Sequence, residues 1–367
     1  MARYDAFCHL QERQRRGDRQ GQEFNGESSL ITRYGGSSLG RDPRIAVVTN
    51  DALGNFVAAT PLLQMLRERH GPCTLDYYGG TRVTQLAQAS DLVDSPIALH
   101  GMSPRALVDQ LKAPYDLVVN VERGAWAQCA TAILAGTSGY VCGPCIDNEG
   151  RAEMPFLGDA RGDLWRDENW VDPKLTQRYD FLDTGFIGEI LCRLAYLDGP
   201  VPGYRLAREA LNVNMVVPDV ILSITASLPD KLWPIERWKA LVNHLTAVGL
   251  SVGLVGAKPV DQGRYWQGAD DESALIAAGV IDLRGLFSLP QVVSVLDAAR
   301  LVLSLDNGIV HLGCATDTPV VGLFRNGIHR LWAPPQPNLH VIEPGDDGRV
   351  ADIDAQQVRA TVDLLLR

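Results

Sequence analysis

One stretch decides the fold of the first half of the chain: Ile45-Ala46-Val47-Val48-Thr49-Asn50-Asp51-Ala52-Leu53-Gly54-Asn55. It begins with a short apolar, partly β-branched run, as expected for a strand that is buried in a parallel sheet. A polar turn that contains a glycine follows. Leu62, Leu63 and Leu66 then mark one face of a helix, with Pro61 expected in its first turn.

The same alternation of strands and helices continues along the chain. Further strands are predicted at 74–78, 117–121, 220–224, 252–255, 301–305 and 320–324. Helices are predicted around 81–89, 104–111, 186–197 and 355–366. Repeated strand–helix units indicate parallel sheets with helices on both faces, so we predict an α/β fold of two Rossmann-like doubly wound domains.

Four regions follow from changes in composition. Residues 1–43 are polar and predict a flexible N-terminal extension, and residues 44–198 form the first Rossmann-like domain. A linker rich in Pro and Gly is expected at 199–218, followed by the second domain at 219–367. Periodicity fades over 147–172, which predicts a long loop. The last helix has an apolar face that could pack back on the first domain.

The composition of the chain excludes several classes of protein. There are 367 residues with 34 basic and 44 acidic side chains, a net charge of -10, which argues against a nucleic-acid partner. No stretch reaches the roughly 18 to 20 apolar residues of a membrane span, and the N-terminus has no signal-peptide core. We therefore expect a cytoplasmic protein without a transmembrane segment. Its seven cysteines are expected to be reduced thiols.

The segment Cys142-Gly143-Pro144-Cys145 has the spacing of a thioredoxin-type redox pair. Such a pair needs a helix N-terminus to lower the pKa of its first thiol. The next residues, 146–150, contain an early glycine and are a poor helix start, so a thiol oxidoreductase is only an alternative. A zinc site would need a second pair at matching spacing, and we expect no metal.

The loop after the first strand, Thr49 to Phe56, lies where ligands gather in an open α/β sheet. It lacks the G-x-G-x-x-G fingerprint of a dinucleotide site, and Gly35, Gly36 and Gly40 precede the strand. A simple connection with a capped helix is the other interpretation.

Two strand ends in the second half carry the parts of a phosphate site. The first holds hydroxyl residues and Lys231 ahead of a helix that starts near Ile235, and the second runs from Ser304 through Asp306 and Asn307 to His311. Lys231 could equally be a solvated loop residue, and His311 a hydrogen-bonded structural group.

These segments together resemble glycosyltransferase family 9, the heptosyltransferase-like enzymes with a GT-B fold. The resemblance covers most of the chain from Ile45 onward. It is carried by Ala52-Leu53-Gly54 with Ala59-Thr60-Pro61-Leu62-Leu63, by Lys231-Leu232-Trp233-Pro234 with Trp238, by Asp306-Asn307-Gly308 with His311 and Thr318-Pro319-Val320-Val321, and more weakly by Asp282-Leu283-Arg284-Gly285 with Ser288-Leu289-Pro290.

The resemblance implies an inverting, metal-independent transfer of a sugar, typically heptose, from an ADP-linked nucleotide-sugar donor, with no cofactor. It implies that the second domain holds the donor and that Lys231 contacts the donor phosphates. Further donor-binding residues implied by it are Thr225, Ser227, Leu283, Gly285, Asp306, Asn307, Gly308 and His311. The first domain then binds the acceptor, and closure about Asp198 to Gly203 would exclude water.

The chain departs from the family at Asn55, where members usually place an aspartate that acts as general base. An amide has no useful basicity, so Asn55 can only orient the acceptor. Asp51 in the same loop and Glu122 after the strand at 117–121 are the alternative bases, although both could be ordinary surface or capping carboxylates.

The acceptor domain does not have the basic surplus that suits a phosphorylated lipid acceptor. Residues 44–200 hold 13 basic and 20 acidic side chains, a difference of -7. We therefore expect a soluble, neutral or cationic acceptor, such as an aminocyclitol or aminoglycoside intermediate of antibiotic biosynthesis. Trp126, Trp165 and Trp170 could stack on a sugar ring or serve as packing residues.

The predicted function is glycosyl transfer to such an acceptor. A lipopolysaccharide core heptosyltransferase is one alternative. The alternatives from other classes are a non-catalytic sugar-nucleotide binder and a thiol oxidoreductase at Cys142 and Cys145.

Overall fold

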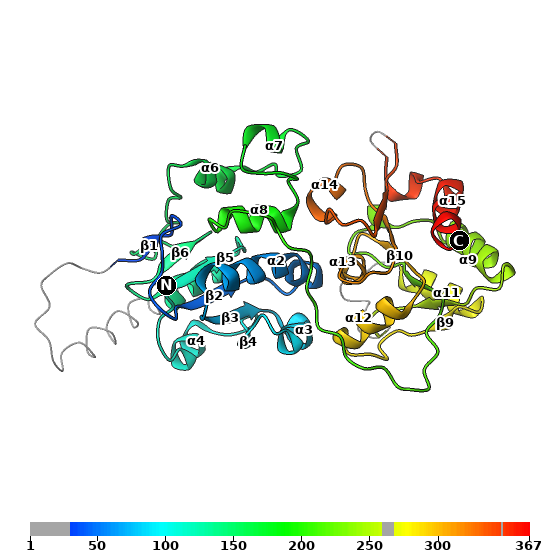
Figure 1. Cartoon of the computed structure of the whole chain (residues 1–367), viewed down its shortest axis with the longest axis horizontal. Helices are drawn as coiled ribbons and strands as arrows, with labels where there is room; N and C mark the ends of the chain where they lie inside the picture. Colours follow the sequence, from blue (N-terminus) through cyan, green and yellow to red (C-terminus); the bar gives the residue numbers. More distant parts are fainter. Residues whose placement is uncertain (1–29, 259–267, 346–347) are drawn as a thin grey trace, which may run out of the picture. The chain divides into compact units, whose positions relative to one another are not determined.

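The computed structural model describes residues 30–258, 268–345 and 348–367, which form two compact α/β units (Figure 1). Of the described residues, the N-terminal unit comprises 30–169 together with Tyr179–Leu182 and Gly188–Pro202. The C-terminal unit comprises Trp170–Arg178, Asp183–Ile187 and Gly203–Arg367. Two short segments therefore belong to the C-terminal unit before the chain enters that unit for good at Gly203. The composition of the sequence did not predict these two segments.

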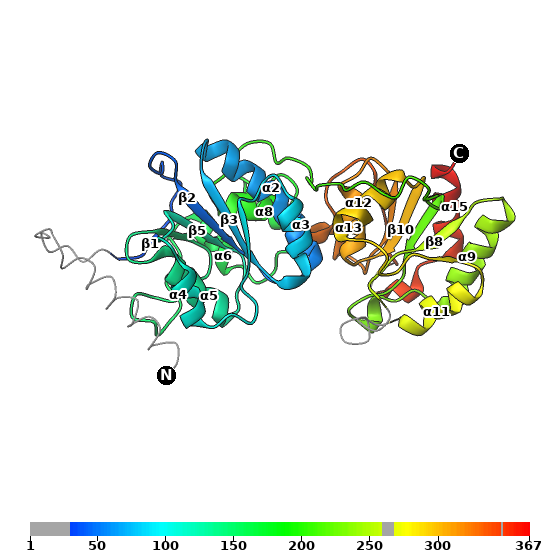
Figure 2. The same cartoon turned by 90° about the horizontal axis from the view of Figure 1, so that it is seen from below.

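A parallel six-stranded sheet forms the centre of the N-terminal unit, in the order β1-β6-β5-β2-β3-β4. Its strands are β1 (Thr32–Arg33), β2 (Arg44–Val48), β3 (Thr74–Gly79), β4 (Ser95–Ala98), β5 (Leu117–Asn120) and β6 (Tyr140–Cys142). Its helical segments are α2 (Leu53–His70), η2 (Thr81–Val83), α3 (Thr84–Ala89), α4 (Pro104–Gln110), α5 (Ala125–Ala135), α6 (Ala160–Arg166) and α8 (Ile187–Leu194). Helix α2 covers one face of the sheet, and α4 and α5 cover the other (Figure 2).

Helix α2 contains Pro61 in its interior, not in the first turn as predicted. The helix begins directly after the β2 turn because the run from Phe56 to Leu66 is almost wholly buried against the sheet. Pro61 has no N–H to donate to the carbonyl four residues back, which belongs to Val57. The Thr60 hydroxyl donates to that carbonyl oxygen at 2.7 Å, so the oxygen keeps a hydrogen bond and the helix continues past Pro61.

The C-terminal unit repeats the architecture, with the sheet order β12-β11-β10-β7-β8-β9 and all strands parallel. Its strands are β7 (Val220–Ser223), β8 (Val252–Leu254), β9 (Ile281–Asp282), β10 (Leu301–Leu305), β11 (Val320–Leu323) and β12 (Leu339–Ile342). Its helical segments are α7 (Leu175–Arg178), η3 (Pro229–Lys231), α9 (Ile235–Ala247), α11 (Ala269–Ala277), α12 (Leu289–Ala298), α13 (Gly308–Cys314), α14 (His329–Trp332), η4 (Val350–Asp352) and α15 (Ala355–Leu365). Numbered from β7, this is the Rossmann strand order.

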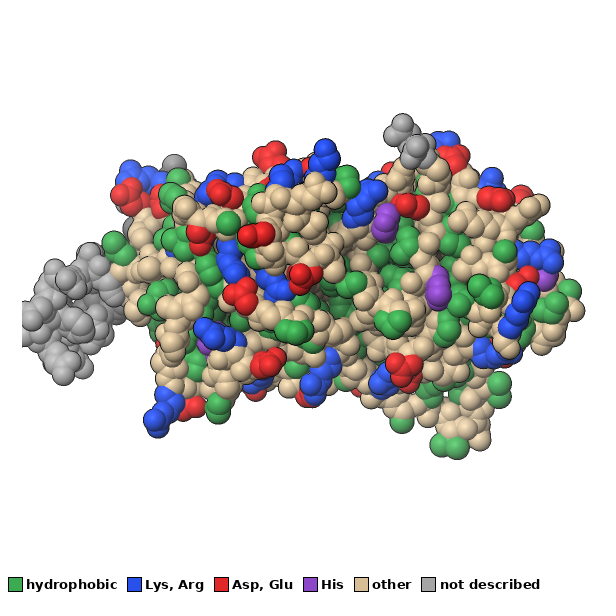
Figure 3. Space-filling model, turned by 45° about the horizontal axis from the view of Figure 1, so that its top comes forward, with side chains coloured by type: hydrophobic (Ala, Val, Ile, Leu, Met, Phe, Trp, Pro, Cys, Tyr) green, Lys and Arg blue, Asp and Glu red, His purple; other side chains and the backbone are tan. Residues whose placement is uncertain are grey.

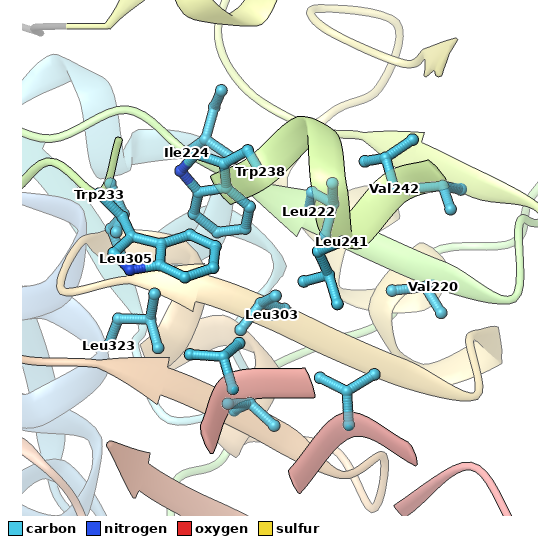
Figure 4. Packing of buried hydrophobic residues seen from close by; sticks show 14 of the residues in the cluster. Val220, Leu222, Ile224, Trp233, Trp238, Leu241, Val242, Leu303, Leu305 and Leu323 are labelled. Atoms are coloured by element: carbon cyan, nitrogen blue, oxygen red, sulfur yellow. The ribbon is translucent and has the colours of Figure 1, made fainter. Parts of the chain in front are cut away.

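The core of the C-terminal unit is built around two tryptophans. Trp233 and Trp238 are each 1% exposed and meet edge to face, with ring centroids 4.9 Å apart (Figure 4). A fully buried tryptophan of this kind is worth about 3–5 kcal/mol of stability against alanine. The Trp233 indole N–H donates to Ile353 O at 3.0 Å, which fixes η4 and the start of α15 against the same core. Both tryptophans are thus structural residues.

The last helix buries its apolar face within its own unit. Val358 and Val362 of α15 are fully buried in the core that Trp238 and β7 share. His244 of α9 bonds Asp363 of α15 at 2.7 Å. The groove that the apolar face of α15 requires is therefore supplied by α9.

Three predicted boundaries also differ from the structure. Residues 1–29 lie outside the described residues, but 30–43 are not a simple extension, because β1 adds an edge strand beside β6. The predicted linker lies along α12, where Arg208 pairs with Asp297 at 3.0 Å. The predicted loop at 147–172 contains α6, which the Asp159 side chain caps by accepting from Gly162 N at 2.8 Å. Short edge strands and locally capped helices leave little periodic signal.

Candidate functional site

Each sheet has one point where the strand order reverses, and ligands of open α/β sheets bind at such switch points, beyond the carboxyl ends of the strands. In the C-terminal unit the reversal lies between β7 and β10, which pair in register from Leu301 beside Val220 to Ser304 beside Ser223. The loops after these two strands hold Thr225 to Lys231 and Asp306 to His311. Most of the predicted donor-binding residues therefore lie at one switch point.

Lys231 and Asp306 form an ion pair at this point. The Lys231 ammonium lies 2.7 Å from Asp306 Oδ2 and donates to the Asp306 backbone carbonyl at 3.3 Å. Lys231 is 15% exposed and Asp306 is 7% exposed, so water screens the pair poorly. An ammonium has three N–H donors, and one of them is used by the Asp306 backbone carbonyl. The contact with Oδ2 is an ion pair, and among the described residues no hydrogen bond reaches that oxygen. The remaining N–H groups and the positive charge can serve an anionic ligand.

Asn307 ties the two loops together. Its amide nitrogen donates to Ser223 Oγ at 3.0 Å and to Thr225 O at 2.8 Å, both at the end of β7. Its amide oxygen accepts from Ser304 Oγ at 3.1 Å and from Ile309 N at 2.8 Å, where it caps α13. All four of these bonds are local to the switch point, so Asn307 fixes the position of Asp306 and of the α13 start.

His311 is buried behind this pair as a neutral imidazole. Its ring is 4% exposed, and its Nδ1 lies 3.2 Å from the hydroxyl of Tyr204. Burial lowers the pKa of His311 to about 4, although the nearby Asp306 carboxylate opposes the shift. The imidazole is therefore uncharged at neutral pH, and it can donate or accept a hydrogen bond without adding a charge to the site.

The remaining predicted donor residues lie along the same sheet edge or in the connecting loop. Leu283 and Gly285 follow β9, two strands from β7, and Gly285 has φ +62°. A Cβ at Gly285 would lie 2.1 Å from Cγ of Lys258, so the backbone approaches that neighbour closely. Ser227 is exposed, and the next helical segment is the short η3 instead of a long helix, because Pro229 and Pro234 delay α9.

The N-terminal unit has its own switch point between β2 and β5, where Val48 pairs with Asn120. Asp51 follows β2, but its carboxylate accepts from Arg82 N at 2.7 Å and is turned onto Gly80, where a Cβ would collide with it. Asp51 thus holds the turn before η2. Asn55 lies in the first turn of α2 and is partly exposed.

Glu122 follows β5 at the same edge and is held less tightly than Asp51. Its Oε1 accepts only the adjacent Arg123 N at 3.0 Å, and its own N–H donates to Asn120 Oδ1 at 2.8 Å. The fully buried Asn120 also donates to Pro144 O at 2.7 Å. The backbone at Glu122 is therefore fixed, while the carboxylate is partly exposed.

The Cys142-Gly143-Pro144-Cys145 segment is a structural turn. A Cβ at Gly143 would lie 1.8 Å from Asn120 O, and Gly143 has φ +93°. Burial raises the pKa of both thiols to about 12, and Cys142 Sγ donates to Leu194 O at 2.9 Å. Such thiols stay protonated at neutral pH, and no helix starts at Cys142 to stabilise a thiolate. The thiol oxidoreductase alternative is therefore wrong.

The three tryptophans suggested for sugar stacking have different surroundings. Trp126 donates its indole N–H to Leu99 O at 3.1 Å and packs on the core of the N-terminal unit. Trp165 is 4% exposed and stacks on Phe156 with ring centroids 5.6 Å apart. Trp165 is therefore a packing residue, whereas Trp126 is only partly buried and stays a predicted acceptor-binding residue. Trp170 is partly exposed and lines a pocket in the C-terminal unit.

Several residues at the donor switch point were missed from sequence. Ser223 and Ser304 lie within predicted strands, where a single hydroxyl gives no signal of its partner. Tyr204 lies in the predicted linker, and an aromatic residue beside Gly203 could have indicated packing. Arg325, which pairs with Asp230 at 2.8 Å, stands just beyond a predicted strand. Their partners are distant in sequence, so spacing could not reveal them.

Charged side chains do not form a continuous basic surface on the face drawn in Figure 3, where acidic and basic groups alternate. Across residues 30–258, 268–345 and 348–367, no cluster of three or more His, Cys, Asp or Glu side chains could hold a metal ion. None of the helices in these ranges combines the length and apolarity needed to cross a membrane.

Residues 203–359 match the family model described as Glycosyltransferase family 9 (heptosyltransferase). Among curated proteins, lipopolysaccharide heptosyltransferase 1 of Salmonella typhimurium is 30% identical over 124 residues, 33% of this chain and 37% of that protein. The matched part thus spans little more than a third of this relative. The sequence resemblance to family 9 is confirmed.

Solved structures share the fold over nearly the whole chain. A family 9 glycosyltransferase from Veillonella parvula has a TM-score of 0.65 at 15% identity, covering 93% of this chain and 99% of its own. The ADP-heptose lipopolysaccharide heptosyltransferase II of E. coli has a TM-score of 0.64 at 17% identity, covering 88% and 98%. These likenesses confirm the predicted GT-B fold with its two doubly wound domains.

The neutral state of His311 predicts how stability changes with pH. The folded pKa of about 4 lies below the ordinary value of 6.5, so the unfolded chain gains a proton there that the folded chain does not. Stability from this group is present above pH 6.5 and is lost as pH falls toward 4, by about 3 kcal/mol in total. Urea denaturation of wild type and His311→Gln should show that the glutamine variant loses less stability between pH 7 and pH 4. Equal losses in both proteins would contradict the buried neutral state.

Proposed function

We propose the activity of this chain from the premise that it belongs to glycosyltransferase family 9: it transfers a heptose-type sugar from an ADP-linked donor to a hydroxyl group of an acceptor. The observation that carries the proposal is the Lys231–Asp306 pair at the switch point, inside the family-matched residues 203–359. The donor is suggested by the relatives, since the E. coli neighbour is named an ADP-heptose heptosyltransferase.

The C-terminal unit binds the donor in this proposal. The base and ribose lie toward Leu283 and Gly285, and the diphosphate lies against Lys231 and the loop from Asp306 to Gly308. Lys231 is suited to stabilise the departing diphosphate. Its ammonium is already in position and poorly screened by water, so it stabilises the negative charge that builds up on the diphosphate in the transition state. The reaction would then proceed without a metal ion.

The chemistry is a single displacement that inverts the anomeric carbon. The acceptor oxygen forms a bond to this carbon as the bond to the donor phosphate oxygen breaks, and the electron pair of that bond leaves with ADP. The acceptor hydroxyl proton passes to a carboxylate, and we assign this role to Glu122. Asp51 is the poorer candidate because its carboxylate already accepts from Arg82 N. Asn55 orients the acceptor.

The acceptor in this proposal is soluble and neutral or cationic, such as an aminocyclitol or aminoglycoside intermediate. The excess of 20 acidic over 13 basic side chains between residues 44 and 200 supports it, since a phosphorylated lipid would be repelled. The names of the curated relatives favour a second candidate, a lipopolysaccharide core acceptor.

Lys231→Ala tests the donor role. Without the ammonium, ADP-heptose turnover should fall by about 100-fold or more, the scale of losing one preorganised charge contact. Product formation is followed by mass spectrometry with 2-deoxystreptamine and with a phosphorylated lipopolysaccharide core as acceptors. The matched control is Lys239→Ala, since Lys239 lies on α9 and pairs only with Glu236 at 3.0 Å. Unchanged turnover in Lys231→Ala contradicts the proposed role, and preference for the phosphorylated core favours the second candidate.

Glu122→Gln tests the proposed general base. General base catalysis contributes about 100- to 10,000-fold, so kcat should fall in that range while ADP affinity stays the same. The comparison variant is Asp51→Asn, in which we expect a smaller loss of kcat because this carboxylate already accepts from Arg82 N. The assignment is overturned if Asp51→Asn lowers kcat more than Glu122→Gln does.

A further inference from the structure

A pocket in the C-terminal unit lies apart from the Lys231–Asp306 pair, which does not line it. It has a volume of about 240 Å³ and is formed by the two early segments of that unit, Trp170–Arg178 and Asp183–Ile187, together with α14. This space is about eight times the volume of a water molecule in the liquid, which suits one sugar-sized ring and not a nucleotide. Its lining includes Trp170, Asp172, Thr176, Phe186, His329 and Arg330.

Two of the three titratable side chains that line this pocket already have an ion-pair partner. The Asp172 carboxylate accepts from Lys174 N at 2.9 Å and pairs with Arg178 at 2.5 Å. His329 Nδ1 lies 2.7 Å from the carboxylate of Glu343. Arg330 has no carboxylate within ion-pair distance in the part of the chain that the structure describes. One guanidinium with hydrogen-bond donors to spare suits hydroxyl groups of a neutral ligand.

Aromatic side chains supply the apolar part of the wall. Trp170 and Phe186 both face the pocket from segments that flank α7. Gly185, at φ +69°, forms the turn before Phe186, and Thr184 Oγ1 accepts from Phe186 N at 3.2 Å. An aromatic face beside hydroxyls and a guanidinium matches a polyhydroxylated ring, which has apolar C–H faces and a polar rim.

The pocket is separated from the donor switch point by one aromatic layer. Phe186 packs on Tyr204 with ring centroids 5.8 Å apart, and Tyr204 packs on His311 at 6.0 Å. On the other side, Trp332 of α14 lies 6.4 Å from the His311 ring. Phe186 of the pocket wall therefore reaches His311 through Tyr204, and α14, which supplies His329 and Arg330 to the pocket, contacts the His311 ring through Trp332. The pocket is thus linked to the donor loops through packed rings.

We propose that this pocket binds a neutral cyclitol or hexose ring of the acceptor, with the ring stacked on Trp170 and its hydroxyls bonded by Arg330. The identification of this ring as part of the acceptor rests on the proposed function. The binding of a neutral ring can be measured without any turnover. It gives the segment 170–187 a role in choosing the acceptor, although the segment belongs to the donor-binding unit.

The test is direct binding of two neutral probes, myo-inositol and methyl α-glucoside, measured by saturation-transfer NMR on the full chain. We expect saturable binding of at least one probe, weakened about tenfold in Trp170→Ala, because one aromatic stacking contact is worth about 1.4 kcal/mol. Trp170→Phe, which keeps an aromatic face, should recover part of the affinity, and Arg330→Gln should weaken binding. Arg359→Gln on the exposed surface of α15 is the matched control and should bind as wild type does.

ADP binding by calorimetry, measured on the same proteins, separates the two possible failures. Retained ADP binding shows that a variant is folded. ADP binding reports on the donor site and not on the pocket. If ADP binds but neither probe does, or if probe binding is the same in Trp170→Ala and Arg330→Gln as in wild type, the inference is overturned and the proposed function stands. If the probes bind and ADP does not bind wild type, the proposed function fails while the ring-binding pocket remains.

Discussion

The amide of Asn307 is the constraint on which the donor site depends. It donates two hydrogen bonds across to the end of β7 and accepts two from its own side, one from Ser304 of β10 and one from Ile309 of α13. Asn307 is partly buried, and removing its amide would take a hydrogen-bond partner from groups at the ends of both strands. Because Asp306 immediately precedes Asn307, the same bonds place the carboxylate that holds Lys231.

The N-terminal unit solves the corresponding problem with Asn120. This fully buried side chain ends β5, the strand across the switch point from β2, and it bridges Pro144 O and Glu122 N. The Cys142–Cys145 turn acquires a physical role here, since Gly143 allows the close approach of this turn to Asn120. Each unit thus uses one asparagine to fix the loop that would carry its chemistry.

Much of the fold could be predicted from sequence because buried parallel strands are short apolar runs. The strands β2, β3, β5, β7, β8, β10 and β11 were found in this way. The strands β1, β4, β6, β9 and β12 were missed, and β1 and β9 have only two residues each. The transfer of Trp170–Arg178 and Asp183–Ile187 to the C-terminal unit depends on packing with α14, which no local pattern contains.

The candidate site was predictable where one motif holds several of its residues together, and not where partners are distant. Asp306, Asn307 and His311 were singled out by order and spacing. The capping role of Asp51 depends on η2, where Arg82 lies thirty-one residues away in sequence, and the neutral state of His311 depends on its burial among residues distant in sequence, such as Tyr204. In both cases a tertiary contact, which sequence spacing does not encode, decides what the side chain can do.

The central claim is that ADP binds at the β7–β10 switch point, and hydrogen–deuterium exchange with and without ADP tests it most directly. The account predicts slower exchange in peptides that contain residues 223–231 and 304–311 when ADP is bound. Peptides with residues 49–55 and 120–124 should then change little. Protection confined to those N-terminal loops, with none at 223–231 or 304–311, would contradict the account.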